Sequence, residues 1–301
     1  MNTFLILNAR ASQDPLLREL IAELRQGGHD VQVRVSWEEG DIYRYAREAD
    51  YLHAAHVIVA GGDGSIHEAI QAQMDAQAEP GSTFALGALP YGTGNDFVRT
   101  VYQEDIWLEQ PYLLLPLLLQ GSTAMLDVGC MGDSVFMNAL SLGYGSTATE
   151  TTPRMIKDML GHSAYTLWGV TSLANMAAFT YSLECHAPEK RVIEGEAWQV
   201  IIGNGQFVGG GFRACPLADL QDGMLDVVIV PKMGTLDTVR AVRLLISEGR
   251  HLEHEQLIHV QVSKASISME SELNINADGE PLTERDMDLH VLPKHSQWLI
   301  P

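Results

Sequence analysis

The sequence predicts an α/β nucleotide-binding domain followed by an antiparallel β-sandwich domain. In residues 1–124, short apolar runs alternate with amphipathic segments, as expected for a mostly parallel sheet with helical crossovers. In residues 125–291, strand-like runs follow one another with turn residues between them, which is typical of an antiparallel β-sandwich. The final apolar segment, 292–301, is expected to return and pack on the first domain.

The first domain shows the alternation most clearly. Asp14 is a good N-cap residue and Pro15 fits the first turn of a helix, which Gly27 and Gly28 would end. The apolar stripe of this helix comprises Leu16, Leu17, Leu20, Ile21 and Leu24. A buried strand is predicted at 3–8, further strands at 30–36, 56–60 and 83–90, and a second helix at 41–49. Ligands of such sheets bind at the carboxyl ends of the strands, so the glycine-rich turns after residues 60 and 90 are expected at that edge.

The second domain is predicted mainly from short apolar runs. These runs lie at 124–130, 134–143, 178–186, 197–204, 224–231, 257–263, 265–269 and 273–280. Helical stretches are expected only near 153–177 and 235–249. Core packing is the default interpretation of the aromatic and methionine-rich segment 159–179, with a lining for acyl chains as the alternative.

Composition excludes several classes of function. Lys and Arg number 19 against 39 Asp and Glu, a formal charge of −20, which argues against nonspecific nucleic-acid binding.

The three cysteines form no C-x-x-C pair, and the N-terminus shows no signal-peptide pattern, so a reduced, cytoplasmic protein is expected. The longest apolar run, 111–120, contains Pro116 and is too short to span a membrane; it predicts a buried helix. His251 and His254 are interpreted as surface residues at a helix end rather than metal ligands.

A first glycine-rich turn lies at 57–70, "VIVAGGDGSIHEAI". Gly61, Gly62 and Gly64 allow close backbone approach to a ligand, and the free N–H groups of the following helix favour an anion. Ser65 and Glu68 have the spacing of a capping box, which predicts that the helix begins at Ser65. The turn contains no Lys or Arg, and Asp63 lies in its middle. A carboxylate here is explained if it attracts Mg²⁺, which would bridge to phosphates; the alternative is a purely structural turn.

A second glycine-rich turn strengthens the nucleotide interpretation. In "LPYGTGNDFVRT", residues 89–100, an apolar strand leads into a turn of glycines, a hydroxyl, an amide and an acid. The turn residues are Gly92, Thr93, Gly94, Asn95 and Asp96. Two such turns at one sheet edge indicate a nucleoside triphosphate with its metal.

The two turns together resemble the diacylglycerol kinase catalytic domain family, which includes bacterial lipid kinases and sphingosine kinases. GGDG-S/T-x-x-E followed by P-x-GT-x-ND-F carries the resemblance in the first domain. In the second domain it rests on the segment 204–230, with its GGG and DGMLD elements, and on "ADGEP" at 277–281. One departure is clear: "NARAS" at 8–12 replaces the Asn-Pro that usually follows the first strand, although Asn8 and Ser12 stay available.

The resemblance implies an NAD kinase-like α/β domain, a β-sandwich lipid-substrate domain, and phosphoryl transfer from ATP-Mg²⁺ to a lipid hydroxyl. It implies Asp278 or Glu280 as the general base. It also implies a structural Mg²⁺ held by Asp222, with backbone carbonyls near Asp219 and Met224. The implied nucleotide contacts are Asn8, Ser12, Ser36, Gly61, Gly62, Asp63, Gly64, Ser65, Glu68, Gly92, Thr93, Gly94, Asn95 and Asp96.

The function expected from the sequence is a lipid kinase that converts diacylglycerol to phosphatidic acid and visits the membrane from the cytoplasm. Its expected partners are ATP and a lipid at the membrane surface, without nucleic acid; a homodimer stays open. One alternative is a kinase for a sphingoid-type lipid or an NAD kinase-like enzyme. The other is a non-catalytic regulator that binds nucleotide or lipid, which would not need Asp63, Asp96, Asp278 and Glu280 together.

Overall fold

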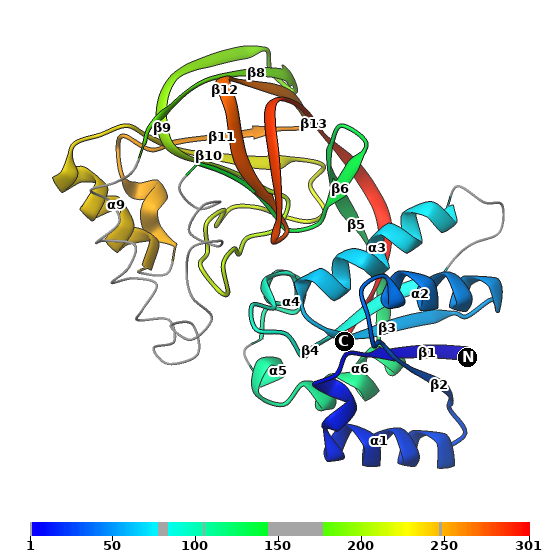
Figure 1. Ribbon diagram of the computed structural model, residues 1–301. Coiled ribbons are helices and arrows are strands. Elements are labelled where there is room, and N and C mark those ends of the chain that lie inside the picture. Colours follow the sequence, from blue (N-terminus) through cyan, green and yellow to red (C-terminus); the bar gives the residue numbers. More distant parts are fainter. Residues whose placement is uncertain (1, 78–83, 105, 144–176, 247–248) are drawn as a thin grey trace. The chain divides into compact units, whose positions relative to one another are not determined.

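The computed structural model describes residues 2–77, 84–104, 106–143, 177–246 and 249–301 (Figure 1). The chain forms two compact units: unit 1 is Met1–Val128 with Pro293–Pro301, and unit 2 is Gly129–Leu292. The helix predicted near 153–177, and most of the segment 159–179, lie outside the described residues.

Unit 1 contains a parallel sheet with the strand order β4–β3–β1–β2. The strands are β1 (Asn2–Leu7), β2 (Asp30–Val35), β3 (His56–Gly61) and β4 (Ala85–Pro90). All three pairings between them are parallel, and β1, β3 and β4 are buried along almost their whole length. The α/β prediction for the first domain is therefore confirmed.

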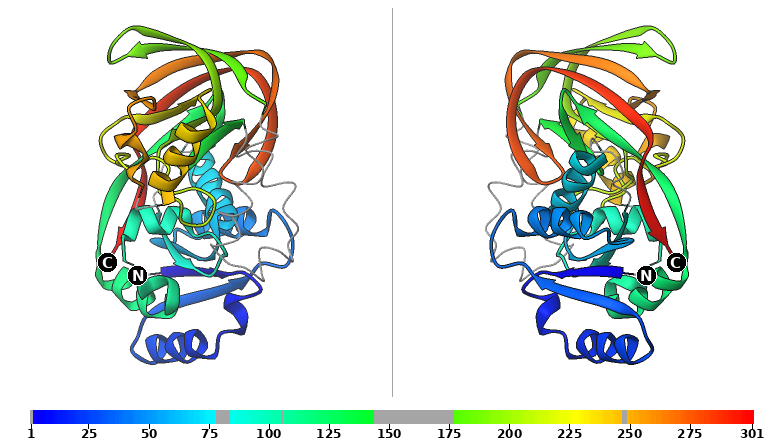
Figure 2. Two further views of the ribbon diagram at one scale, coloured as in Figure 1. Left: turned by 90° about the vertical axis from the view of Figure 1, so that its left-hand side faces the viewer. Right: turned by 90° about the vertical axis from the view of Figure 1, so that its right-hand side faces the viewer.

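Helices cover both faces of this sheet, with α1 on one side and α2 and α3 on the other (Figures 1 and 2). The helical elements are η1 (Ala11–Gln13), α1 (Pro15–Gln26), α2 (Asp41–Tyr51), α3 (Asp63–Gln77), α4 (Asp96–Tyr102), α5 (Ile106–Glu109), η2 (Pro111–Leu113) and α6 (Leu114–Gln120). Asp14 caps α1 as predicted, since its carboxylate accepts from the N–H groups of Leu16 and Leu17. The expected apolar stripe is wrong at Leu16, whose side chain is 47% exposed.

The apolar run 111–120 is divided between η2 and α6. Leu114, Leu115 and Leu118 are buried, but Leu113 and Leu117 are partly exposed, so the helix is amphipathic rather than buried all round. Within the part of the chain that the structure describes, no helix is long and apolar enough to cross a membrane.

The C-terminal segment belongs to unit 1. In β13 (Glu280–Ile300), Trp298 pairs in parallel with Leu86 of β4. Its ring lies 4.8 Å from that of Phe97, centroid to centroid, and the indole is 1% exposed. The buried Gln73 of α3 donates to the carbonyl of Gln297 at 3.3 Å, so polar groups of the segment are paired as well.

Unit 2 is largely antiparallel. Its strands are the end of β5 (Ser122–Met131), β6 (Ser134–Phe136), β7 (Ala139–Gly143), β8 (Phe179–Ala187), β9 (Arg191–Gly203), β10 (Leu225–Pro231), β11 (Ile258–Val262), β12 (Lys264–Ala277) and the first part of β13. The long strands β9 and β12 each pair with β8 over one half and with β7 over the other. The helices described in this unit are α9 (Thr235–Ile246) and η4 (Arg250–Glu253).

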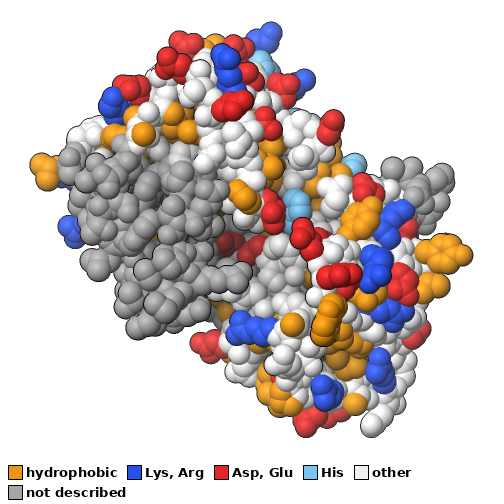
Figure 3. All heavy atoms as spheres, in the orientation of Figure 1, with side chains coloured by type: hydrophobic (Ala, Val, Ile, Leu, Met, Phe, Trp, Pro, Cys, Tyr) orange, Lys and Arg blue, Asp and Glu red, His pale blue; other side chains and the backbone are white. Residues whose placement is uncertain are grey.

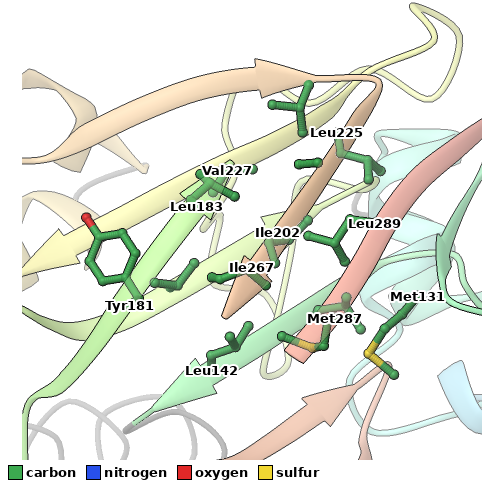
Figure 4. Close-up of a cluster of buried hydrophobic side chains, with 14 of the residues drawn as sticks. Met131, Leu142, Tyr181, Leu183, Ile202, Leu225, Val227, Ile267, Met287 and Leu289 are labelled. Carbon is green, nitrogen blue, oxygen red and sulfur yellow. The ribbon is translucent and has the colours of Figure 1, made fainter. Parts of the chain in front are cut away.

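The core of unit 2 consists of the inward-facing side chains of these strands. Figure 4 shows Leu142, Leu183, Ile202, Ile267 and Leu289 pointing toward one another from β7, β8, β9, β12 and β13. Each is at most 1% exposed. Fully burying a side chain of this size contributes about 1.5–3 kcal/mol, so this cluster is a main source of the unit's stability.

His251 and His254 are buried, at only 3% and 5% exposed. Their interpretation as surface residues is therefore wrong. Burial lowers the pKa of His251, and its Nε2 lies 2.9 Å from the carbonyl oxygen of Ala214. The three cysteines are free and buried, and burial raises the pKa of Cys130 to about 11.

Candidate nucleotide and catalytic sites

The carboxyl ends of the unit 1 strands lie at one edge, and Asn8 links three of them. Its backbone N–H donates to Ala60 at the end of β3, and its side-chain amide donates to the carbonyl of Tyr91 after β4, at 3.3 Å. Its Oδ1 accepts from the N–H of Ala11 at 2.8 Å, which fixes the start of η1. Ser36 continues the β1–β2 pairing by donating to Leu7.

The two glycine-rich turns pack directly against each other at this edge. A Cβ on Gly92 would lie 2.3 Å from the Cα of Gly62 and 2.7 Å from Oδ1 of Asn95. A Cβ on Gly61 would lie 2.5 Å from the side chain of Ser65. The glycines therefore serve the contact between the turns as well as any approach of a ligand.

We expect Gly92→Ala to lower the free energy of unfolding by about 1–3 kcal/mol, because the added methyl group meets backbone atoms that cannot move aside. Gly64→Ala is the matched control, since a Cβ there has no heavy atom within 4 Å. That change lies inside α3 and should be neutral or stabilising by up to about 1 kcal/mol. Denaturant unfolding without nucleotide measures both. Equal stability of the two variants would contradict the packing account.

Asp63 connects the first turn to the second. Helix α3 begins at Asp63, so the prediction of a start at Ser65 is wrong. The Oδ1 of Asp63 accepts from the N–H of Phe97 at the start of α4, at 3.0 Å. Glu68 closes no capping box either; its Oε2 accepts from the N–H of Tyr43 in α2, at 3.3 Å. Asp63 thus has a structural role whatever it does toward a metal.

The second turn is held by Asn95. This residue has a positive φ of 55° and precedes α4. Its Oδ1 accepts from the N–H of Gly92 at 2.9 Å, and its amide donates back to the carbonyl of Gly92 at 3.1 Å. Asn95 and Asp96 are buried, while Thr93 at the tip is exposed. The backbone of the turn is therefore fixed before any ligand arrives.

Arg10 is a residue of this edge that the sequence did not point to. Its guanidinium donates to the carbonyl of Gly92 at 3.2 Å and is exposed. It comes from the same 8–12 segment that departs from the Asn-Pro pattern. The Oγ of Ser12, by contrast, bonds locally to the carbonyl of Ala9 at 2.8 Å. The first glycine turn contains no cation of its own; Arg99 donates to the carbonyl of Gly94 in the second turn at 3.4 Å, and Arg10 adds another cation beside Gly92.

In unit 2, the segment Asp278–Glu280 is a tight hairpin between β12 and β13. Ala277 pairs with Glu280, which leaves Asp278 and Gly279 as a two-residue loop with positive φ angles of 49° and 104°. Asp-Gly is a favoured sequence for such a turn. Both Asp278 oxygens accept backbone N–H groups: Met137 at 2.6 Å, Asn138 at 2.9 Å and Ala139 at 2.9 Å.

Glu280 is placed differently from Asp278. Its side chain is exposed at the start of β13, and no described residue hydrogen-bonds to its carboxylate. The structure therefore separates the two acids of this turn: the Asp278 carboxylate is fixed to backbone N–H groups, whereas the Glu280 carboxylate is open to solvent.

The segment 219–224 also forms a turn with outward-facing oxygens. Asp219 Oδ1 accepts from the N–H of Gln221 at 3.0 Å, and Asp222 Oδ1 accepts from the N–H of Met224 at 2.9 Å. Gln261 on β11 donates to Asp222 Oδ2 at 3.2 Å. No group of three or more His, Cys, Asp or Glu side chains in the described chain forms a metal site. A cation here would need backbone oxygens or water in addition to the carboxylates.

Comparison with known proteins gives the family of the chain. Residues 2–131 match the diacylglycerol kinase catalytic domain, and residues 138–299 match the YegS C-terminal NAD kinase beta sandwich-like domain. The chain belongs to the YegS-like lipid kinases. Its enzyme class, predicted from the glycine turns and the 204–230 segment, is thus confirmed as lipid kinase.

Individual relatives match along the whole chain. The protein of Chromohalobacter salexigens named "Probable lipid kinase YegS-like" is 35% identical over 97% of this chain and 91% of its own. A protein of the same name from Shewanella frigidimarina is 31% identical over 99% and 93%. The crystal structure of a diacylglycerol kinase from Bacillus anthracis str. Sterne aligns with a TM-score of 0.74 at 22% identity, covering 100% of this chain and 97% of that one. At this identity the structural match supports the fold alone.

Proposed function

We propose that this member of the family transfers the γ-phosphate of ATP to a lipid hydroxyl, with diacylglycerol as the acceptor and phosphatidic acid as the product. The observation that carries the proposal is the contact between the two glycine turns at Gly62 and Gly92, with Asp63 bonded across them. This arrangement places half-buried glycine backbone beside the carboxylate of Asp63, a combination suited to ATP with its metal. The protein would act in the cytoplasm and at the membrane surface.

The nucleotide contacts we propose are Asn8, Ser12, Ser36 and the two turns. Asp63, which is half-buried, is a hard oxygen donor of the type that Mg²⁺ prefers, so it fits the metal of ATP-Mg²⁺. Mg²⁺, when bound with ATP, would neutralise charge on the phosphates. Arg10 adds a fixed positive charge beside Gly92. Glu68 is a weaker candidate, because its carboxylate accepts from α2.

The general base that we propose is Glu280. A base must come within hydrogen-bond distance of the acceptor hydroxyl and take its proton. The three backbone N–H groups on Asp278 occupy both of its oxygens, whereas Glu280 is exposed and unengaged among the described residues. Asp278 is instead a positioning residue that holds the hairpin carrying Glu280.

A structural Mg²⁺ at Asp219, Asp222 and Met224 is the second metal that we propose. The set is composed of hard oxygens, one from the Asp222 carboxylate and the others from backbone carbonyls near Asp219 and Met224, which fits Mg²⁺. The bond from Gln261 to Asp222 ties the turn to β11. Its role would be to hold this turn in place.

For this site we expect Asp222→Ala to lower both activity and the melting temperature in Mg²⁺, and to remove the stabilisation that Mg²⁺ gives the parent. Asp133→Ala is a control, as Asp133 is an exposed acid in another turn of unit 2. Melting curves of the three proteins in Mg²⁺ and in EDTA provide the test. An Asp222→Ala protein that melts like the parent in both buffers would remove the proposed metal site.

The acceptor is tested by measuring kcat/KM for a panel of lipids in mixed micelles. Diacylglycerol, monoacylglycerol, a sphingoid base and phosphatidylglycerol each present a hydroxyl in a different headgroup. The proposal predicts the highest kcat/KM for diacylglycerol. A clearly higher kcat/KM for another lipid of the panel would leave the lipid kinase activity in place and show that the acceptor is that lipid instead of diacylglycerol.

A further inference from the structure

Trp37 is the most exposed large hydrophobic side chain among the described residues, at 93%. Two other tryptophans, Trp107 and Trp298, are buried at 9% and 1%. Hydrophobic side chains protrude between charged ones on the surface in Figure 3, and single exposed ones need no explanation. An almost fully exposed indole on a fixed turn is different, because it presents a large apolar face to solvent.

The backbone that carries Trp37 is held rigidly. The N–H groups of Trp37 and Glu38 both donate to Oδ2 of Asp41, at 2.7 and 3.2 Å. These bonds lower the pKa of the Asp41 carboxyl, which is 4% exposed. Gly40, with a φ of 82°, closes the turn in a conformation that favours glycine. The backbone that supports the indole is thus already ordered, so little backbone conformational entropy is lost when a ligand binds.

The position of Trp37 relates it to the glycine turns. Ser36 pairs with Leu7, so Trp37 follows β2 at the same carboxyl edge where Gly61 ends β3. Strands β2 and β3 flank β1, and neighbouring strands lie about 4.8 Å apart, which puts their ends about 10 Å from each other. A nucleotide with its phosphates at the glycine turns can direct its base along this edge toward β2.

We propose that the indole of Trp37 is the platform on which the purine base of the nucleotide stacks. The inference rests on the proposed function and adds the base subsite to it. Base stacking on an aromatic side chain is sequence-tolerant and needs only an accessible ring face. Exposed tryptophans can also bind at a membrane surface. The exposed acids Glu38 and Glu39 follow Trp37 directly and would repel anionic lipid headgroups, whereas the purine base is uncharged and its phosphates would lie at the glycine turns.

The test compares calorimetric titrations of ATP and of inorganic tripolyphosphate, both with Mg²⁺. Trp37→Ala should weaken ATP binding about tenfold, within the range known for stacking, and leave tripolyphosphate binding unchanged. Trp37→Phe keeps a ring and should recover most of the affinity for ATP. Tyr51→Ala is the matched control: Tyr51 is 82% exposed at the other end of α2, and its removal should change neither titration.

Several results would overturn the inference. Unchanged ATP affinity in Trp37→Ala would overturn the stacking proposal. The proposed function would still stand, because the parent protein would have been shown to bind ATP. Equal losses for ATP and tripolyphosphate would show damage to the turn instead of a lost stacking contact. Loss of binding to vesicles of phosphatidylglycerol and phosphatidylethanolamine, with ATP affinity retained, would assign Trp37 to the membrane. A parent that binds neither ligand would contradict the proposed function as well.

Discussion

Glu280→Gln is expected to lower kcat by about 10²–10⁴-fold at a nearly unchanged KM for ATP, the range for loss of a general base. Glutamine keeps the size of the side chain but cannot accept the hydroxyl proton. Since the Glu280 carboxylate has no hydrogen bond to a described residue, the fold should be unaffected. Steady-state kinetics with varied ATP, together with a melting curve, measure both effects.

Asp278→Asn is the matched comparison, and it should behave differently. Its amide group cannot accept from all three backbone N–H groups, so one or more buried donors lose their partner. An unsatisfied buried group costs about 1–3 kcal/mol, and we expect lower stability together with reduced activity. Two results together would show that Asp278 is the general base instead. The Glu280→Gln enzyme would turn over like the parent, and the Asp278→Asn enzyme would fold normally but be inactive.

The second large effect is expected at Asp63. If its carboxylate acts through Mg²⁺, Asp63→Asn should greatly reduce turnover of ATP-Mg²⁺. Metal-free ATP should bind no worse than to the parent, because a like charge next to the phosphates has been removed. Asparagine still has an oxygen that can accept from the N–H of Phe97, so the link between the turns survives. ATP titrations with Mg²⁺ and with EDTA measure the two affinities.

A purely structural Asp63 makes another prediction. Weaker binding to the same degree with and without the metal would mean that the residue only supports the turns. A third variant, Asp63→Ala, removes the acceptor for Phe97 and should lower stability in both buffers. If Asp63→Asn and Asp63→Ala gave the same losses, the charge of Asp63 would not be what matters.

The strand pattern and the enzyme class followed from the sequence because they depend on local patterns. Apolar runs of buried parallel strands, the Asp14-Pro15 helix start and the glycine-rich turns each lie within a few residues. The capping box at Ser65 failed because the spacing of Ser and Glu does not fix which residue begins the helix. The chain starts α3 at Asp63, and Glu68 bonds to α2 instead. That partner is distant in sequence, at Tyr43, and no local pattern could point to it.

The same limit explains what was missed in the sites. Asp278 and Glu280 are equivalent in the sequence, and only the backbone N–H groups of 137–139, about 140 residues earlier in the chain, distinguish them. Arg10 could not be connected with Gly92 for the same reason. Trp37 carried a weak signal, an aromatic residue within a polar turn after a strand. The exposure of its indole, on which the stacking proposal rests, depends on the fold and cannot be read from the sequence.

Transfer of phosphate from ATP to a lipid by this chain can be followed with labelled ATP. Parent enzyme and Glu280→Gln are incubated with γ-labelled ATP, Mg²⁺ and mixed micelles that contain diacylglycerol, with NAD added as a competing acceptor. The account predicts label in extracted phosphatidic acid with the parent, at least about 10²-fold less with Glu280→Gln, and none in the NAD fraction. Label in NAD, or release of phosphate with no labelled lipid, would contradict it.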